Sequence, residues 1–149
     1  MDAQQMWREC RKIYPALGEH ANAWSFGVEA DHLADLVLRG EKTATSSAYD
    51  LYAVDQEALP QAGSFHLILD SRGQAVCIIE IRKVSILPFC QVPAEHAYKE
   101  GEGDKSLDYW RRTHREVFSQ WLNEAGLAFS EESKIVLEEF CRIYPLEHR

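Results

Sequence analysis

Residues 65–87 have the sequence FHLILDSRGQAVCIIEIRKVSIL, and this segment predicts a β-hairpin. Phe65, Leu67 and Leu69 recur at every second position, which is the spacing of one face of a strand. The residues DSRG then favour a turn, and residues 75–87 continue as a mostly apolar segment rich in β-branched side chains. Two adjacent antiparallel strands are therefore the starting point for the fold.

Segments with helical spacing lie on both sides of this hairpin. Apolar residues recur at steps of three and four in three stretches, which we predict to be helices: residues 3–15, 31–39 and 106–125. Asp31 and Ser106 are the expected N-caps of the second and third helices. Between the second helix and the hairpin, small hydroxyl residues at 40–50 are typical of a loop.

The order of these elements indicates the fold class. A short helical piece is expected at 93–98, and a final strand at 134–144. Helices stand before, between and after the strands without regular β-α-β alternation, which predicts an α+β fold whose strands could close as a small barrel. A length of 149 residues is close to the commonest domain size, so we expect a single domain.

The charge balance limits the kinds of partner. Sixteen Lys plus Arg against twenty-four Asp plus Glu give a formal net charge of -8. Such a surface opposes binding that is driven by counterion release along phosphates, so long duplex nucleic acid is not an expected partner. A small nucleoside or nucleotide, or a short RNA, remains compatible with a local cleft. The sequence does not indicate an oligomeric state.

The cysteines and the N-terminal sequence predict a reduced cytoplasmic protein. Cys10, Cys77, Cys90 and Cys141 are far apart and form no C-x-x-C motif, so we expect buried apolar thiols rather than a zinc site or a redox pair. The sequence begins without the basic and apolar segments of a signal peptide, and no apolar run is long enough for a membrane span. No membrane association is therefore expected.

The segment GEKTATSS at residues 40–47 is the strongest candidate for chemistry. A lysine and a hydroxyl, Lys42 and Thr45, are three residues apart in it. A desolvated lysine could act as a base that takes the proton from a threonine nucleophile. Alternatively, Lys42 caps the carbonyls of the preceding helix while the hydroxyls satisfy a turn. Residue types alone favour this second, structural role.

A second candidate is the acidic loop around residues 99–106. Glu100, Glu102 and Asp104 are separated by glycines, so one carboxylate could be placed in a cleft to position a lysine or to exchange protons. These acids lack the ligand number and spacing of a calcium loop, and we expect neither a metal nor another cofactor. A solvated surface turn is the alternative that the residue types favour.

Aromatic side chains offer surfaces on which a base could stack. Trp24, Phe26, Tyr49, Tyr52 and Trp110 are the candidates, with Trp24 and Phe26 in a strand-like segment ahead of the GEKTATSS motif. Trp110 has the helical spacing of a core residue, which favours a plain packing role for it.

Two charged positions stand among apolar neighbours. His114 lies on an apolar helix face, where a hydrogen-bonded core histidine is more common than a proton carrier. Alternation puts Glu80 on the same strand face as Arg82, which predicts a lateral ion pair on an exposed or cleft-lining face.

Three segments together resemble the ASCH family: GEKTATSS, CIIEIRKV and EHAYKEGEGDKSLDYW. The resemblance extends from Trp24 to Tyr144 and implies a PUA-like fold, in which a small antiparallel or mixed β-barrel is surrounded by helices. Residues 1–149 would then form a single ASCH domain, with the helix at 3–15 as an N-terminal extension. The family is linked with RNA and modified nucleosides.

The resemblance also implies an activity. Small bacterial members include an amidohydrolase that removes the acetyl group from N4-acetylcytidine, and its site residues correspond by position to Lys42, Thr45 and Glu100. The pair His96 and Ala97 fixes the register of the glutamate. In this assignment Thr45 attacks the amide carbonyl, Lys42 accepts its proton, and Glu100 positions Lys42 or the leaving amine.

We expect six residues to contact the substrate: Trp24, Phe26, Ser47, Tyr49, Glu80 and Trp110. One of them differs from the residue of many family members. Ser47 stands where many members carry an arginine, so an anionic ligand would be held differently or not at all. Two alternatives to the hydrolase remain: a non-catalytic module that binds RNA or a modified nucleotide, and a ribonuclease, which would need phosphate-neutralising groups near Lys42.

Overall fold

The computed structural model describes residues 1–19 and 21–146. Its elements follow one another in this order: α1 Ala3–Ile13, β1 Asn22–Trp24, α2 Ala30–Leu38, β2 Ala44–Ala48, α3 Tyr49–Val54, β3 Phe65–Leu69, β4 Ala75–Pro88, the 3-10 turn η1 Phe89–Gln91, α4 Ala94–Glu100, α5 Leu107–Glu124 and β5 Lys134–Tyr144. The predicted α+β class is confirmed. Within the described residues, no helix is both long and apolar enough to cross a membrane.

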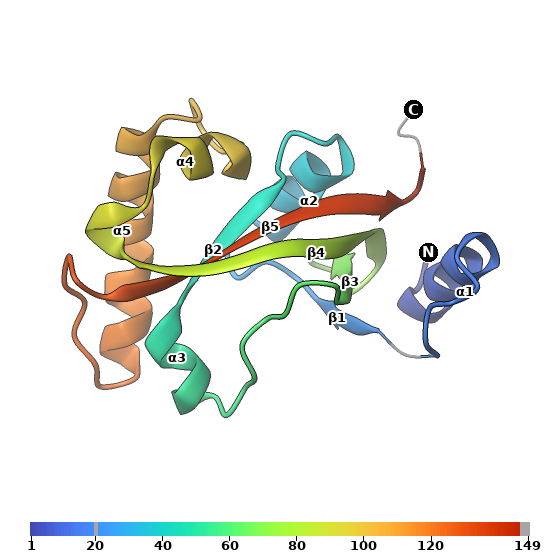
Figure 1. Cartoon of the computed structure of the whole chain (residues 1–149), viewed down its shortest axis with the longest axis horizontal. Helices are drawn as coiled ribbons and strands as arrows, with labels where there is room; N and C mark the ends of the chain where they lie inside the picture. The colour runs from blue at the N-terminus through green and yellow to red at the C-terminus, as the bar shows by residue number, and fades with distance from the viewer. Residues whose placement is uncertain (20, 147–149) are drawn as a thin grey trace.

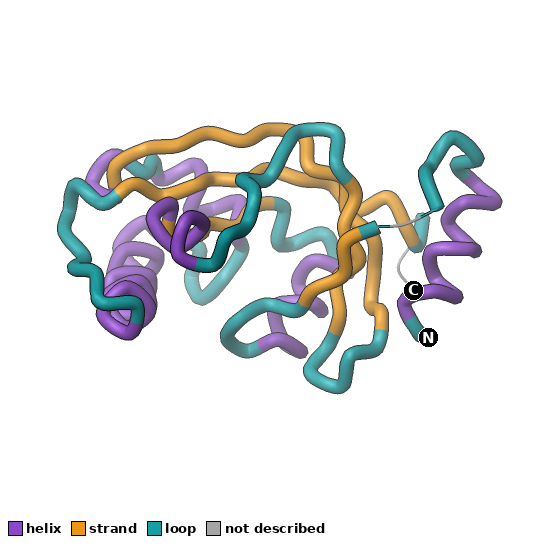
Figure 2. Tube along the Cα trace, turned by 90° about the horizontal axis from the view of Figure 1, so that it is seen from below, coloured by secondary structure: helices purple, strands orange, loops and turns teal. Residues whose placement is uncertain are grey.

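The strands of the described residues form one five-stranded sheet in the order β1-β3-β4-β5-β2. Only β1 and β3 pair in parallel, and the other pairs are antiparallel. The register between β4 and β5 shifts twice, between Ile78 and Ile79 and between Ile81 and Lys83. Such irregularities bend a strand and increase its twist, and Figure 2 shows the resulting curled sheet. The expected barrel is thus a half-barrel, with β1 and β2 at its free edges.

Helices cover the two ends of this sheet, as Figure 1 shows, with α4 and α5 beside one end and α1 beside the other. The core at the α4 and α5 end is built from apolar side chains of α5, of β5 and of the segment around η1: Phe89, Val92, Trp110, Phe118, Leu122 and Ile135. Separate clusters lie under α2 and α1. The periodic apolar faces that predict these helices are therefore the faces that the sheet buries.

The predicted hairpin is confirmed by the antiparallel pairing of β3 with β4. Ser106 caps α5 as expected, because its side chain accepts a hydrogen bond from the backbone of Tyr109. Asp31, by contrast, does not cap α2, which begins one residue earlier, after Glu29. Its carboxylate instead accepts hydrogen bonds from the backbone N–H and the hydroxyl of Ser71, at 2.7 and 2.8 Å, and so ties α2 to the hairpin turn.

The prediction of a loop at residues 40–50 is wrong for most of that segment. Ala44–Ala48 form β2, which pairs antiparallel with β5, and α3 begins at Tyr49. Ala44 and Ala48, the first and last residues of the strand, are buried. The three hydroxyl residues that separate them in the sequence are partly exposed. Tertiary pairing here outweighs the local preference of serine and threonine for turns.

Two further expectations need partial correction. Glu100 belongs to the last turn of α4 and is buried, so the acidic segment is not a solvated loop from its start. Gly101 ends that helix with a φ of 73°, a conformation that favours glycine. The predicted burial of the thiols is confirmed for Cys10 and Cys77, whereas Cys90 and Cys141 are partly exposed.

Candidate functional site

Lys42 is a buried lysine whose charge is shared by two glutamates. Its side chain is 1% exposed, and its Nζ lies 3.2 Å from Oε1 of Glu100 and 2.8 Å from Oε2 of Glu102. The backbone carbonyl of Glu100 is a third acceptor, at 3.5 Å. An ammonium group has three N–H donors, so this geometry suits the charged form. The alternative role as a helix cap is wrong for the side chain, because the hydrogen bonds of Nζ to the described residues go to Glu100 and Glu102, whereas it is the backbone N–H of Lys42 that donates to α2, at Leu36.

Glu100 is the centre of the surrounding hydrogen-bond network. Besides Lys42, its carboxylate accepts hydrogen bonds from Ser46 Oγ at 2.8 Å, His96 Nε2 at 2.9 Å and Trp110 Nε1 at 2.5 Å. Burial by itself would raise the pKa of Glu100, but the charge of Lys42 and the hydrogen bond from His96 hold that pKa well below its usual value. The network joins α4, α5 and β2 around one ionised carboxylate.

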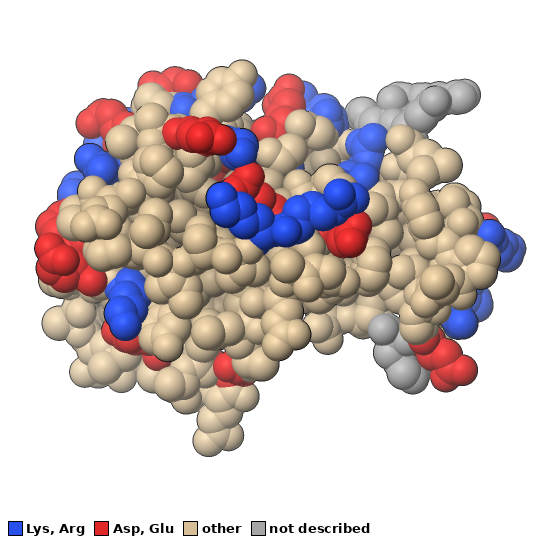
Figure 3. Space-filling model, viewed as in Figure 1, with Lys and Arg blue, Asp and Glu red and all other residues tan. Residues whose placement is uncertain are grey.

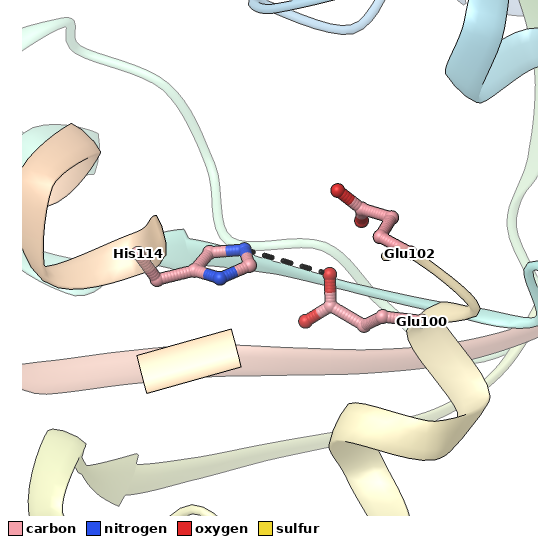
Figure 4. A group of neighbouring side chains, drawn as sticks. All are labelled: Glu100, Glu102 and His114. Carbon is pink, nitrogen blue, oxygen red and sulfur yellow. Dashed lines mark ion pairs between the residues drawn. The ribbon is translucent and has the colours of Figure 1, made fainter. Parts of the chain in front are cut away.

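Glu100, Glu102 and His114 offer a set of side chains that could hold a metal ion. Figure 4 shows Glu100 at the end of α4, Glu102 in the loop after it and His114 on α5. One ligand atom from each lies within 4.8 Å of the others. The ammonium of Lys42 already contacts both carboxylates, so a metal ion would compete with it for the same oxygens. The positive charge that these acids need is supplied by the protein itself.

A cavity of about 830 Å³ opens beside this network, within the size range of small-molecule sites. Trp24 and Phe26 line it with rings in an edge-to-face arrangement, 5.1 Å between centroids. Thr45, Ser46 and Ser47 line it from β2. Phe26 also links the cavity to the network, because the Nζ of Lys42 lies 5.4 Å from its ring centroid.

The cavity and the network around Glu100 meet at neighbouring residues of β2. Thr45 and Ser46 both line the cavity, and the hydroxyl of Ser46 also donates a hydrogen bond to Glu100. Lys42 is not among the residues that line the cavity. Among the described residues, the hydrogen bonds of its Nζ go to the two glutamates and none goes to Thr45. Within the described residues, the proposed nucleophile and the buried lysine therefore share no hydrogen bond.

The remaining sequence-predicted residues divide into two groups. Trp24, Phe26 and Ser47 line the cavity, with the Ser47 hydroxyl 2.6 Å from that of Tyr52. The other three predicted substrate contacts do not line it: Tyr49, Glu80 and Trp110.

Each of those three has another role. The ring of Tyr49 lies 5.3 Å from Nζ of Lys134. Glu80 forms the predicted lateral ion pair with Arg82, at 2.9 Å. Trp110 is buried in the core, as its helical spacing favours, and its indole N–H donates a hydrogen bond to Glu100.

Three residues of the site escape sequence reasoning. His96 serves in the sequence only as a register marker, although its spacing of four residues from Glu100 on one helix is a signal for their contact. Ser46 could have been found only with the strand in place. Glu138, one of two adjacent glutamates in β5, lines the cavity and is 8% exposed. His114 stacks on Trp110 as a core residue would, yet its Nε2 also lies 3.6 Å from Glu100.

His66 fixes one wall of the cavity through a chain of hydrogen bonds. Trp24 Nε1 donates to His66 Nδ1 at 3.0 Å, so the neutral ring carries its hydrogen on Nε2 and can donate to Ser64, also at 3.0 Å. The Ser64 hydroxyl donates to the carbonyl of Gln61 at 2.6 Å. Burial lowers the pKa of His66, which keeps the ring neutral as this chain requires.

We expect acid to destabilise the protein through His66. Because its pKa is lower in the folded state, the contribution of the neutral ring is fully present above the unfolded pKa of about 6.5 and is lost as the pH falls through the folded value. The stability advantage of the wild type over His66→Gln, measured by denaturant unfolding, should be smaller at pH 5 than at pH 8. His32→Gln, at an exposed position, is the control. An advantage that does not change with pH would contradict this assignment.

Comparison with known proteins places these observations in a family context. The model of the ASCH domain family matches residues 22–144. Similar solved structures include an ASCH domain from Lactobacillus crispatus JV V101, with a TM-score of 0.86 and 36% identity over 95% of this chain and 93% of that one. The structure of protein EF3133 from Enterococcus faecalis V583 has a TM-score of 0.85 and 31% identity, over 93% of this chain and 86% of that one. The hypothetical protein PH0355 shares the fold alone. Its TM-score is 0.55 and its identity 15%, over 81% of this chain and 99% of that one. No curated protein matches.

Proposed function

Because this chain belongs to the ASCH domain family, whose fold is PUA-like, we propose that it is a hydrolase that cleaves the amide bond of an acylated nucleoside such as N4-acetylcytidine. One observation carries the proposal. Thr45 lies in the wall of a nucleoside-sized cavity with two aromatic rings, and the next residue, Ser46, is hydrogen-bonded to the buried Lys42–Glu100 pair. A nucleophile, a stacking surface and a fixed charge network therefore meet at one strand.

In the proposed reaction, Thr45 Oγ attacks the acyl carbonyl and forms a tetrahedral intermediate. The C–N bond then breaks, the nucleoside amine leaves, and water hydrolyses the acyl ester on Thr45. Trp24 and Phe26 are suited to stacking against the base, which is worth about 1–3 kcal/mol in comparable contacts. Ser47 and Tyr52 present a hydroxyl pair for the polar parts of the ligand.

Lys42 and Glu100 complete the proposed centre. Through Ser46, the carboxylate of Glu100 fixes the middle of β2 and so holds Thr45 in the cavity wall. The Lys42 charge lies beside the cavity, behind Phe26, where it can stabilise negative charge that develops on the carbonyl oxygen. The family resemblance also makes Lys42 the proton acceptor. Its three donors face three oxygens here, an arrangement that leaves no lone pair for a proton.

Release of cytidine from N4-acetylcytidine tests the proposal. We expect Thr45→Val, which keeps the side-chain shape and suits a strand, to lower kcat by at least about a thousandfold, as loss of a nucleophile does elsewhere. Thr43→Val is the matched control, because the hydrogen bond of the Thr43 hydroxyl goes to the carbonyl of Lys99, at 3.4 Å, and Thr43 does not line the cavity. Both variants should melt near the wild-type temperature. Full activity of Thr45→Val would contradict the proposal.

The non-catalytic alternative predicts a different result in the same experiment. A binding module for RNA or a modified nucleotide would show no turnover, while cytidine or a short RNA would raise the melting temperature. The surface makes this alternative less favourable. Figure 3 shows a short band of basic side chains on one face with acidic side chains beside it. The basic residues of β4 and α4 are engaged in ion pairs: Arg82 with Glu80, Lys83 with Glu139, and Lys99 with Glu95 and Glu139.

Ribonuclease activity is disfavoured for a related reason. It would need free positive charge near Lys42 to neutralise a phosphate, and the charge of Lys42 is already shared by Glu100 and Glu102.

A further inference from the structure

Glu138 is a buried carboxyl that faces the cavity. It lies on β5, is 8% exposed and lines the cavity. Among the described residues, no hydrogen bond or ion pair engages its carboxyl group, in contrast to Glu100, whose carboxylate accepts from several donors. A buried carboxyl without a partner is unfavourable for stability. Its presence therefore points to a ligand or to a reaction.

The strand register places Glu138 directly beside Thr45. The two residues are Cα partners in the antiparallel pairing of β5 with β2. Side chains of directly opposed residues leave the sheet on the same face, with Cβ atoms about 4.5–5.5 Å apart. The next residue, Glu139, points the other way and forms surface ion pairs with Lys99 and Lys83. Of the two adjacent glutamates, Glu139 thus forms ion pairs at the surface, whereas Glu138 faces the cavity.

Resting on the hydrolase function proposed above, we propose that Glu138 is the general base and acid of that reaction. As a carboxylate it accepts the proton of Thr45 Oγ while the oxygen attacks the acyl carbonyl. As a carboxylic acid it gives that proton to the nitrogen of the nucleoside when the C–N bond breaks. It then accepts a proton from the water that attacks the acyl ester, and returns this proton to Thr45 Oγ as the ester breaks. The net consumption is one water, and no other reactant is needed.

Other groups near Thr45 are less suited to this role. The donors of Lys42 are committed to three oxygens, and the carboxylate of Glu100 already accepts several hydrogen bonds. Glu57 also lines the cavity, but its side chain is exposed. Among the described residues that line the cavity, Glu138 alone combines burial, an unengaged carboxyl and a position opposite the nucleophile.

The electrostatic surroundings of Glu138 favour a proton shuttle near neutral pH. Burial, followed by the negative charge of Glu100, raises its pKa to about 7, and the charge of Lys42 opposes the rise. A group whose pKa lies near the working pH populates both the base and the acid form. The titratable groups that face it or share its cavity are Lys42, Glu100, Tyr52, Glu57 and His66.

The pH dependence of kcat/KM for N4-acetylcytidine, measured from pH 5 to 9, tests this role. In the wild type the rate should rise with pH and level off above a midpoint near 7, as Glu138 ionises. Glu138→Gln should lower kcat by about a hundredfold to ten-thousandfold and abolish that rise. Glu138→Asp keeps a titratable carboxyl, so it should retain the rise at a reduced rate. Glu139→Gln, on the opposite face, should keep both the rate and the profile.

The outcomes separate this role from the proposed function. If the wild type and Thr45→Val behave as proposed but Glu138→Gln keeps the wild-type profile, the role of Glu138 is overturned and the hydrolase stands. Absence of wild-type turnover would overturn both. If Glu138→Gln does not fold, Glu138→Asp decides the matter: a wild-type rate with no pH-dependent limb near 7 would overturn the role.

Discussion

Replacement of Lys42 by methionine is expected to lower the free energy of unfolding by about 3–5 kcal/mol at neutral pH, the usual cost of breaking a buried ion pair from one side. Lys42 is the cation between Glu100 and Glu102. Without it, Glu100 would be a buried carboxylate left with the hydrogen bonds from Ser46, His96 and Trp110. The methionine side chain fills a similar volume, so the loss should reflect charge rather than a cavity.

Lys99→Met is the matched control for this prediction. Lys99 also contacts two carboxylates, Glu95 at 2.9 Å and Glu139 at 2.7 Å, but its side chain is 34% exposed. Exposed ion pairs contribute little to stability, so this variant should be close to the wild type in a denaturant titration. Adding Glu100→Gln to Lys42→Met should restore part of the loss, because the uncompensated charge is then removed. Equal stability of Lys42→Met and Lys99→Met would contradict the assignment.

The pH dependence gives a second check on the same pair. In the wild type the pKa of Glu100 is held well below its usual value, so the stability that it contributes is fully present above the unfolded pKa of about 4.3. It is lost as the pH falls through the folded pKa. Lys42→Met removes the charge that lowers this pKa. The difference in unfolding free energy between the two proteins should therefore be largest near pH 7 and should shrink below pH 4.

The elements that the sequence predicts well are those whose pattern is local. Alternation in β3 and β4 and helical spacing in α1 and α5 are properties of neighbouring residues, and the structure confirms all four. The strand β2 was missed because its residues prefer turns, and its stability comes from pairing with β5, far along the chain. Lys42 is likewise far from its glutamates in the sequence, 58 residues from Glu100 and 60 from Glu102.

The site was predictable only in part for the same reason. The family resemblance gives Lys42, Thr45 and Glu100, and the structure brings Lys42 into contact with Glu100 and places Thr45 in the adjoining cavity. Which of Glu138 and Glu139 faces the cavity depends on register. The pairing of β4 with β5 shifts between Ile81 and Lys83, beside these residues, and a shift of one residue exchanges the faces of a strand. No local pattern in the sequence reports such a shift.

Gly101 fixes the distance between the acidic loop and Lys42. Its φ is 73°, and a Cβ built on it would lie 2.3 Å from the carbonyl oxygen and 2.8 Å from the carbonyl carbon of Glu41. These are backbone atoms next to Lys42, so the clash cannot be relieved by rotating a side chain. The close approach of the two backbones places Glu100 and Glu102, on either side of Gly101, against the lysine.

We expect Gly101→Ala to lower the free energy of unfolding by about 2–5 kcal/mol, the sum of a left-handed conformation at about 1–2 kcal/mol and a backbone clash at about 1–3 kcal/mol. Gly73→Ala is the control for the first contribution, because Gly73 has a φ of 76° and a Cβ there would meet no atom within 4 Å. It should cost about 1–2 kcal/mol. Denaturant unfolding of both variants isolates the contact.

Since the backbone of Glu41 must move to admit the methyl group, Gly101→Ala should also pull Lys42 from its carboxylates and weaken the pH dependence assigned to Glu100. A loss no greater than that of Gly73→Ala would mean that the two backbones are not held together at this point.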